Sequence, residues 1–467
     1  MQAEQILAKV GRALDILIEV GDQYQGLFPS LIDRQSHRML SELPPPIPGQ
    51  RQGDRSHLGS NLIHDEAALL TLYALDKPHY RDAADRYLRR FATHCTDTAT
   101  GLFPWGEHAY WHLGDDKVGN SGLISRPDAQ GGATHDHLRQ APLWLWEKLQ
   151  QFDSNCVQGF ADGLDFHWVE GEPAEYIRHA RIEIRERLGR GTRSCDFPRH
   201  GGFYIFDWAF AYGQSRRPEL VGYIEKMLDY WWPLRDPSGQ LLIESRSPET
   251  DERFYQTNAP GQTLSLGVSL LEAAPLLEDD QPELARLMRQ RAAVYLGGFL
   301  AAPHDLEDGI FAITCSRAGN RVDAMPVWGS VYGLWPVSYV ALTALCGYRL
   351  SGDQGLLGWA VTAGENYRQG GLPKGVAVPA MDAGLGLGLL ADLYDITGEE
   401  RWLQSGLALA GELVGVYCDA DLPRGAAGID WYESQMGPSF LLHGLARIAL
   451  LALEGPGCRL AADYTAR

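Results

Sequence analysis

The sequence lacks the features that mark membrane-spanning, secreted and nucleic-acid-binding proteins. No apolar run approaches the roughly 18 residues of a membrane-spanning helix. The first residues, Met-Gln-Ala-Glu-Gln, have neither the basic nor the apolar region of a secretory signal. Basic residues are in deficit, since 41 Lys and Arg face 60 Asp and Glu and leave a formal net charge of −19. A field of this sign argues against binding to nucleic acid or an anionic membrane, although a few arginines in a cleft can still bind an acidic substrate.

Paired cysteines are absent as well. The seven cysteines are widely separated, and none belongs to a C-x-x-C pair. An odd, scattered set is a poor framework for disulfides and is typical of a reducing compartment. Together these absences predict a cytoplasmic protein whose partner is neither a membrane nor a nucleic acid.

The sequence does contain a repeated phrase. Gly26-Leu27-Phe28-Pro29 recurs unchanged as Gly101-Leu102-Phe103-Pro104, and degraded copies begin at Gly239, Gly309 and Gly371. Successive copies are 75, 138, 70 and 62 residues apart, and the second spacing is about two units long. A repeat of this length fits one pair of antiparallel helices plus a loop.

A second signature predicts the turn inside each helical hairpin. It begins at Tyr73, Tyr212, Tyr348 and Tyr394, where an apolar stretch ends in a small polar turn before a new helical pattern opens. Gly and Asp in these turns suit the end of one helix and the start of the next. Four copies indicate at least four hairpins of the same design.

Hydrophobic periodicity predicts an all-α toroid of six or seven helical hairpins that forms a single domain over residues 1–467. The inner helices are apolar on most sides, and the outer helices are amphipathic. A helix over 3–20 has no sequential partner, so we expect it to pair with the last inner helix and close the ring. The inner helices are expected at 62–75, 137–151, 202–213, 260–277, 329–349, 381–396 and 437–453, and the outer ones at 79–94, 172–189, 217–232, 281–299, 354–368 and 400–417.

The loops at one mouth of such a ring are the expected place for function. Trp105, Glu107, His108 and Tyr110 follow directly after the second Gly-Leu-Phe-Pro copy. Aromatic rings and polar groups together suit the faces and hydroxyl-bearing edges of sugars, and histidine with a carboxylate can also bind a metal. The structural alternative is that these rings only seal the ends of helices.

Two further clusters begin the next inner helices. His135, Asp136 and His137 combine imidazole with carboxylate, which suits a divalent transition ion, although Asp136 could instead cap a helix. Arg199 and His200 precede a Gly-Gly pair and offer an anion clamp beside a metal ligand or general base.

Arg253 and Tyr255 are predicted to form another wall of the cleft, where Arg253 could bind a uronate carboxylate. The predicted substrate-binding set is therefore Trp105, Glu107, Tyr110, Arg253 and Tyr255. An ion pair of Arg253 with a neighbouring acid is the structural alternative.

The Trp-Gly-x-His loop, the His-Asp cluster and the Arg-His pair followed by Gly resemble the pectate lyases of polysaccharide lyase family 2. The resemblance implies an (α/α)7 toroid that cleaves polygalacturonate by β-elimination, with a bound divalent transition ion such as Mn²⁺ and an arginine base. Carried over motif by motif, Arg199 is the base and His200 a metal ligand. His108 and a member of the His135-Asp136-His137 cluster complete the metal site, and the expected partner is a uronate-containing oligo- or polysaccharide.

The implied chemistry is consistent with these residue types. β-Elimination removes the weakly acidic proton beside the uronate carboxylate, and a divalent cation on that carboxylate stabilises the developing charge. Arginine is an unusual base because its pKa is normally above about 12, but a nearby cation favours its neutral form. The acidic ligand stays open between Asp136 and Glu147.

Three other functions remain open at this point. An isomerase of the N-acylglucosamine 2-epimerase kind would use histidine acid–base pairs, drawn from His135, His137, His200 and His443. A glycoside hydrolase would need two carboxylates across the cleft, such as Glu107 with Asp382 or Asp430. A non-catalytic binding or scaffold protein is the last alternative.

Overall fold

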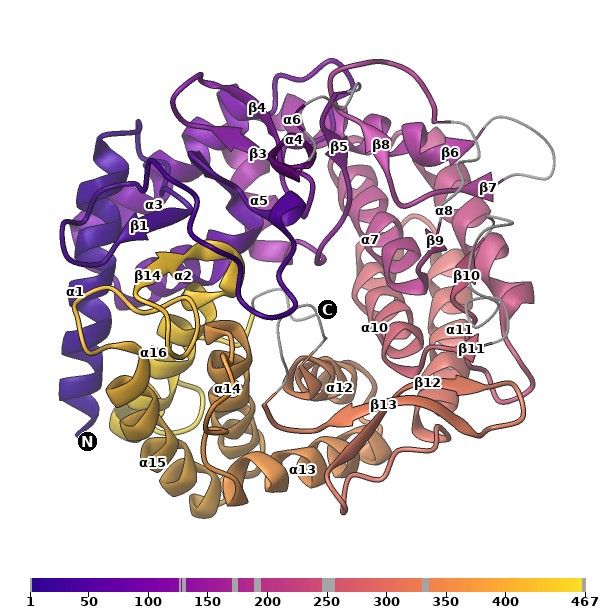
Figure 1. The fold of residues 1–467 in the computed structure, drawn as a ribbon. Coiled ribbons are helices and arrows are strands. Elements are labelled where there is room, and N and C mark those ends of the chain that lie inside the picture. The colour runs from indigo at the N-terminus through magenta and orange to yellow at the C-terminus, as the bar shows by residue number, and fades with distance from the viewer. Residues whose placement is uncertain are drawn as a thin grey trace.

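The helices of the computed structural model form a ring (Figure 1). The structure describes residues 2–125, 127, 132–169, 175–188, 195–245, 257–329 and 336–463. In this part of the chain, helices that are consecutive in the sequence pack against each other as hairpins. The pairs are α2 (Leu62–Leu75) with α3 (Pro78–Arg90), α5 (Leu143–Phe152) with α6 (Ser154–Gly163), α7 (Pro198–Ser215) with α8 (Pro218–Trp231), α10 (Pro260–Leu277) with α11 (Pro282–Leu300), α12 (Val337–Ser351) with α13 (Gln354–Gln369), and α14 (Ala380–Thr397) with α15 (Glu400–Tyr417).

The two ends of the chain close the ring. Helix α16 (Pro438–Glu454) packs against α1 (Ala3–Asp22), α2 and α14. A buried ion pair adds a polar connection, because Arg55 donates from Nε to Glu433 Oε1 (2.6 Å) and from Nη2 to Oε2 (2.8 Å). The predicted toroid, and its closure by the first helix on the last inner helix, are therefore confirmed.

The inner helices are buried on nearly all sides because other helices cover them on every flank. Helix α10 packs against α7, α11 and α12, and α14 packs against α12, α15 and α16. Most residues of α14 are buried, whereas the outer helix α8 buries only one stripe. This division matches the sequence pattern of apolar inner and amphipathic outer helices. None of the described helices is both long and apolar enough to cross a bilayer.

Short antiparallel ladders form in the connections between helices. Each sheet has two or three strands. The connections also contain a four-residue helix, α4 (Gly122–Ser125), and a 3₁₀ turn, η1 (Gln52–Asp54). The ladders are β1 (Leu31–Asp33) with β14 (Trp431–Glu433), β2 (Gly59–Ser60) with β3 (Ala109–His112) and β4 (Lys117–Asn120), β5 (Thr134–His135) with β8 (Ala180–Arg181), β6 (Trp168–Val169) with β7 (Glu175–Tyr176), β9 (Cys195–Asp196) with β10 (Glu244–Ser245), and β11 (Thr257–Asn258) with β12 (Ile310–Ser316) and β13 (Arg321–Pro326).

One predicted helix is wrong. The described part of the predicted helix 172–189, residues 175–188, is not helical; it contains β7 and β8 with bends between and after them. Its backbone bonds to neighbouring loops, since Ile177 N–H donates to His167 O (2.9 Å) and Ile182 N–H to Ala133 O (3.0 Å). These long-range bonds outweigh the helical propensity of the Arg- and Glu-rich sequence.

The helix expected at 137–151 is shifted. It begins only at Leu143, after Pro142 in extended conformation, so the His135-Asp136-His137 cluster precedes it by several residues. Its hairpin partner is α6, a helix that the sequence pattern did not indicate.

Left-handed backbone occurs at the turn signature and at four of the five Gly-Leu-Phe-Pro copies; the copy at Gly371 does not have it. The turn signature ends its first helix at Asp76, Arg216, Gly352 and Gly398, each with φ between 52° and 74°. The Gly-Leu-Phe-Pro copies begin with Gly26, Gly101, Gly239 and Gly309, whose φ values lie between 71° and 96°. Glycine adopts this conformation without steric cost, and this is the physical reason for its return in the repeat.

We expect Gly101→Ala to lower the free energy of unfolding by about 1–3 kcal/mol. The φ of Gly101 is +80°, and an added Cβ would lie 2.2 Å from the carbonyl oxygen of Gly159. Gly222→Ala is the matched control, because a Cβ on this residue of α8 would meet nothing within 4 Å. Urea unfolding followed by circular dichroism measures both. Equal stability of the two variants would contradict the structural role of the repeat.

Candidate functional site

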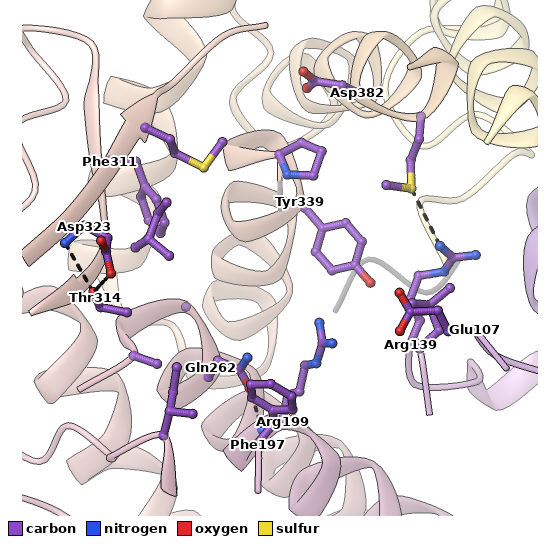
Figure 2. A pocket seen from close by; sticks show the side chains of 18 of the residues that line it. Glu107, Arg139, Phe197, Arg199, Gln262, Phe311, Thr314, Asp323, Tyr339 and Asp382 are labelled. Atoms are coloured by element: carbon purple, nitrogen blue, oxygen red, sulfur yellow. Dashed lines mark hydrogen bonds between the residues drawn. The ribbon is translucent and has the colours of Figure 1, made fainter. Parts of the chain in front are cut away.

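A cavity of about 650 Å³ lies where the inner helices begin. The first turns of α7, α10, α12 and α14 contribute Arg199, Gln262, Tyr339 and Asp382 to its wall (Figure 2). Strands β12 and β13 add Phe311, Ile313, Thr314, Asp323 and Met325 on another side. Because the N-terminal ends of helices carry partial positive charge, their convergence favours an anionic ligand.

The charged side chains that line the cavity are positive on balance, whereas the whole chain is negative. Four arginines line the cavity in the described residues, against the three carboxylates Glu107, Asp323 and Asp382. They are Arg51, Arg139, Arg178 and Arg199. In a chain with a net charge of −19, the cavity wall thus carries a small local surplus of positive charge.

Phe197 contacts two of these arginines. The guanidinium carbons of Arg178 and Arg199 lie 5.1 Å and 5.6 Å from the centre of its ring. Phe197 is the residue that precedes α7, and Arg199 is the second residue of that helix. Burial lowers the pKa of Arg199, and the neighbouring charge of Arg178 lowers it further, against the effects of Tyr339 and Glu107.

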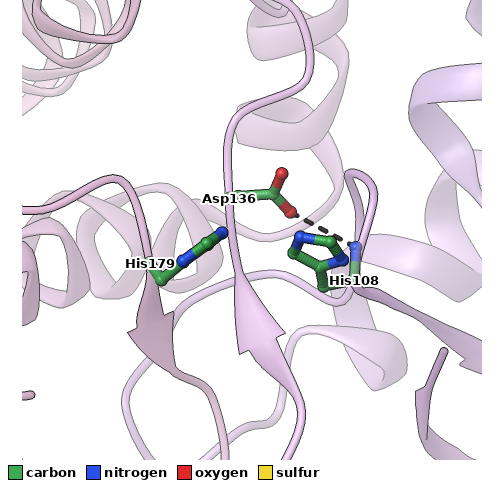
Figure 3. A group of neighbouring side chains, drawn as sticks. All are labelled: His108, Asp136 and His179. Atoms are coloured by element: carbon green, nitrogen blue, oxygen red, sulfur yellow. Dashed lines mark hydrogen bonds between the residues drawn. The ribbon is translucent and has the colours of Figure 1, made fainter. Parts of the chain in front are cut away.

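A candidate metal group lies next to this cavity. His108, Asp136 and His179 each offer one ligand atom, and these atoms all lie within 4.8 Å of one another (Figure 3). His108 precedes β3, Asp136 follows β5, and His179 precedes β8. Glu107, the neighbour of His108 in the chain, lines the cavity and connects the two features.

Backbone pairing explains why Asp136 meets His179. The β5–β8 ladder pairs Thr134 with Arg181 and His135 with Ala180. One step further along this antiparallel register, Asp136 stands opposite His179, where the two side chains share a face. Residues 43 positions apart in the sequence thereby become neighbours.

Backbone contacts also hold the His108 loop against Asp136. The N–H groups of Glu107 and His108 both donate to Asp136 Oδ1, at 3.1 Å and 3.3 Å. Gly106, with φ of +95°, makes this approach possible, because a Cβ there would lie 2.1 Å from Asp136 O. The Trp-Gly-x-His motif thus needs its glycine for close packing.

The electrostatics of the group suit a divalent cation. Burial holds the pKa of His179 well below its ordinary value and raises the pKa of Asp136. His179 Nε2 is buried without a hydrogen-bond partner in the described residues. A cation would keep Asp136 ionised and give His179 Nε2 a partner, and two imidazoles with a carboxylate are ligands that transition ions prefer.

A second group adjoins the first through His108. Asp54, from η1, lies with Glu107 and His108, and their ligand atoms are also within 4.8 Å of one another. Burial and the charge of Glu107 raise the pKa of Asp54 to about 7. Asp54 was not anticipated from the sequence, because its segment carries no motif.

The other histidines expected at the metal lie apart from these groups in the described residues. His135 accepts from Trp105 Nε1 (3.1 Å) and contacts His167 (2.8 Å), and His137 Nε2 lies 2.6 Å from Asp207 Oδ2. All of these side chains are buried. Within the His135-Asp136-His137 cluster, Asp136 is thus the residue that lies with His108.

His200 follows Arg199 in the first turn of α7 but lies outside both groups and outside the described cavity wall. Its ring packs 5.5 Å from that of Phe197 and 5.9 Å from that of Phe203. Side chains at adjacent helix positions point about 100° apart, so Arg199 reaches the cavity while His200 points into the packed interior. Neither ring nitrogen has a hydrogen-bond partner in the described residues.

The remaining residues named from the sequence are distributed as follows. Glu107 lines the cavity, whereas Trp105 and Tyr110 are buried and do not line it in the described residues. Trp105 packs against Phe103 and Trp146 in the core. Arg253 and Tyr255 lie outside the described residues.

Three residues named for the alternative functions or as the acidic metal ligand lie away from the cavity. Glu147 lies within α5, and His443 of α16 contacts Ala461 O at 2.8 Å. Asp430 pairs with Arg34 (2.7 Å) and Arg424 (3.2 Å). None of these three lines the cavity in the described part of the chain.

Sequence reasoning missed Arg178 and His179. The signal was available, because Arg178-His179 repeats the dipeptide Arg199-His200. The predicted outer helix at 172–189 gave this dipeptide no place at the mouth of the ring.

No family model and no curated protein matches this sequence. Among solved structures, the chain is similar to an α-1,2-mannosidase from Trichoderma reesei, with a TM-score of 0.57, 13% identity, and 99% of this chain and 98% of that chain covered. It is also similar to a D-mannose isomerase, with a TM-score of 0.50, 12% identity, and 81% and 99% coverage. At these identities the likeness shows the α/α toroid fold alone, and the resemblance to polysaccharide lyase family 2 stays a prediction.

We expect His179→Ala to weaken binding of Mn²⁺ or Co²⁺ by at least about tenfold, because it removes one of three ligands. Metal content of the dialysed protein and titration with Co²⁺ followed by visible absorption measure the effect. His94→Ala is the matched control, since His94 lies 3.1 Å from Asp116 in an exposed His–Asp pair on another surface. Unchanged affinity in the folded His179→Ala protein would exclude His179 as a ligand.

We expect His137→Ala to lower the free energy of unfolding by about 3–5 kcal/mol while the metal affinity stays unchanged. The substitution leaves the buried Asp207 carboxyl without its histidine partner. Replacing both residues, in His137→Leu with Asp207→Leu, is expected to recover part of the loss. Chemical unfolding and the same Co²⁺ titration test the two parts, and a loss of metal with unchanged stability would instead make His137 a ligand.

Proposed function

We propose that this chain is a carbohydrate-active enzyme, and specifically a lyase that cleaves a uronate-containing oligo- or polysaccharide by β-elimination. One observation carries the proposal. The motif residues Glu107 and Arg199 line the same cavity, and His108 and Asp136 lie directly behind Glu107. All three sequence clusters that carry the lyase resemblance therefore contribute to one site.

In this proposal Arg199 removes the C5 proton of the uronate. Its burial lowers its pKa and so raises the fraction of neutral guanidine that can accept a proton. Tyr339 lies on the same wall, and Figure 2 shows its hydroxyl pointing into the space between Arg199 and Arg139. This hydroxyl can donate a proton to the oxygen that leaves from C4 as the double bond forms.

The residues present fit the implied metal. His108, Asp136 and His179 would hold a divalent transition ion, and such an ion would supply positive charge that stabilises the substrate carboxylate as it becomes an enediolate on loss of the C5 proton. Glu107 and Arg139 would orient the sugar on the same side of the cavity. The apolar surface of Phe197 and Phe311 suits the C–H faces of a sugar ring.

A glycoside hydrolase is the second candidate. The carboxylates Glu107, Asp323 and Asp382 all line the cavity, and hydrolysis needs two such groups on opposite sides of the scissile bond. The similar α-1,2-mannosidase has the same fold. A sugar isomerase is the third candidate, because the similar D-mannose isomerase also has this fold; against it, no histidine lines the cavity in the described residues.

We expect polygalacturonate or a related uronate oligomer to yield an unsaturated product that absorbs in the ultraviolet. EDTA should abolish the reaction, and Mn²⁺ should restore it. Arg199→Ala should lower kcat by about 10²- to 10⁴-fold while the far-ultraviolet circular dichroism stays unchanged, because it removes the base.

Arg217→Ala, a substitution in an ion-paired surface arginine, is the control and should keep full activity. New reducing ends without ultraviolet absorption, lost in Glu107→Gln or Asp382→Asn, would overturn the lyase proposal in favour of hydrolysis.

A further inference from the structure

Arg178 and His179 are neighbours in the chain that contribute to two different features. They lie in the short connection between β7 and β8, where Arg178 is at a bend. His179 joins the metal group, and Arg178 lines the cavity. A single stretch of backbone, fixed to β5 by the Thr134–Arg181 and His135–Ala180 pairs, therefore positions both residues.

Arg178 differs from the other arginines of the wall in its partners. Arg139 donates to Ile63 O and lies 3.8 Å from Glu66 Oε1, and Arg51 lies 3.9 Å from Asp54 Oδ2. Arg178 makes no hydrogen bond or ion pair with any residue that the structure describes, and its Nε is buried. Arg178 lines the cavity, and its charge also opposes the rise that burial causes in the pKa of the nearby Asp136.

Packing fixes the direction of this cation. The guanidinium carbon of Arg178 lies 5.1 Å from the centre of the Phe197 ring, which also contacts Arg199. An aromatic face restrains a guanidinium without using its N–H donors, so the donors of Arg178 stay available to a ligand. Arg178 is therefore held in place before any ligand arrives.

We propose that Arg178 is the specificity residue that binds the carboxylate of an acidic sugar beside Arg199. The inference rests on the proposed function for the identity of the ligand as a uronate. The planar fork of a guanidinium matches a carboxylate in two parallel hydrogen bonds, and a neutral sugar offers no such partner. The converging ends of α7, α10, α12 and α14 favour the same sign of charge. A carboxylate on Arg178 would place the sugar ring against Phe197, with Arg199 within reach of the adjacent carbon.

The test compares an acid with its ester. Methyl α-galacturonide and methyl β-glucuronide cannot undergo the elimination, because they carry no sugar at O4. Isothermal titration of each glycoside and of its methyl ester therefore measures binding alone. We expect the wild-type protein to bind the acids at least about tenfold more tightly than the esters, and Arg178→Gln to remove this preference while affinity for the esters is unchanged. Arg178→Lys should keep part of the preference, since it retains the charge without the fork.

Arg185→Gln is the matched control. Arg185 follows on the same connection but is exposed and donates to Ala99 O (3.1 Å), so its loss should leave the preference intact. A wild-type protein that does not distinguish acid from ester would overturn the inference. A folded Arg178→Gln protein that keeps the preference for the acid would also overturn the inference. Equal loss of affinity for acid and ester in this variant would overturn it too, because that pattern indicates a structural role for Arg178. If Arg178→Gln does not fold, the Arg178→Lys result decides, because an unchanged preference there contradicts recognition by the fork.

The inference and the proposed function can fail separately. An acid preference that depends on Arg178, without unsaturated product from any uronate, would remove the lyase proposal and leave the binding role standing. Unsaturated product together with an unchanged acid preference in Arg178→Gln would remove the binding role of Arg178 and leave the lyase proposal standing.

Discussion

Burial of the inner helices on all sides is the constraint on which this structure depends. Helices such as α10 and α14 have apolar residues around nearly their whole circumference, so each needs neighbours on both flanks and an outer helix behind it. A closed ring satisfies this requirement for every inner helix at once, and the contact of α16 with α1 completes it. Because the helix interiors are filled, polar chemistry is confined to their ends, where the cavity lies.

The same geometry concentrates charge at that cavity. Helix starts converge there, and arginines from loops far apart in sequence add full charges to the partial charges of the helix ends. Arg51, Arg139, Arg178 and Arg199 come from four different segments, three of which also contribute to the two His-carboxylate groups or adjoin them. Cavity and candidate metal group are thus adjacent: four arginines and three carboxylates line the cavity, and His108, Asp136 and His179 lie next to it. This charge distribution is what supports the proposal of an acidic sugar as the ligand.

The ladder between β5 and β8 connects the two parts of the unit. Two paired residues on each strand are enough to bring Asp136 opposite His179 and to direct Arg178 into the cavity. The ladder is short, but it is anchored by buried side chains on both sides, among them Ala133, Ala180 and Ile182. Changes in this segment are therefore expected to affect metal binding and substrate recognition together.

Local patterns in the sequence were enough to predict the toroid, four of its hairpin turns and the approximate positions of most inner helices. Apolar periodicity and the glycine of the repeat are local signals, since burial pattern and left-handed backbone leave their mark within a few residues. The sequence also identified Glu107, His108, Asp136 and Arg199 as polar residues at the mouth of the ring. Only the tertiary structure decided which of the clustered histidines lie with His108, and it added His179, Asp54 and Arg178. The physical reason is that these contacts depend on strand register and on which face of a helix turn points inward. Both are decided by packing between segments that are distant in the sequence.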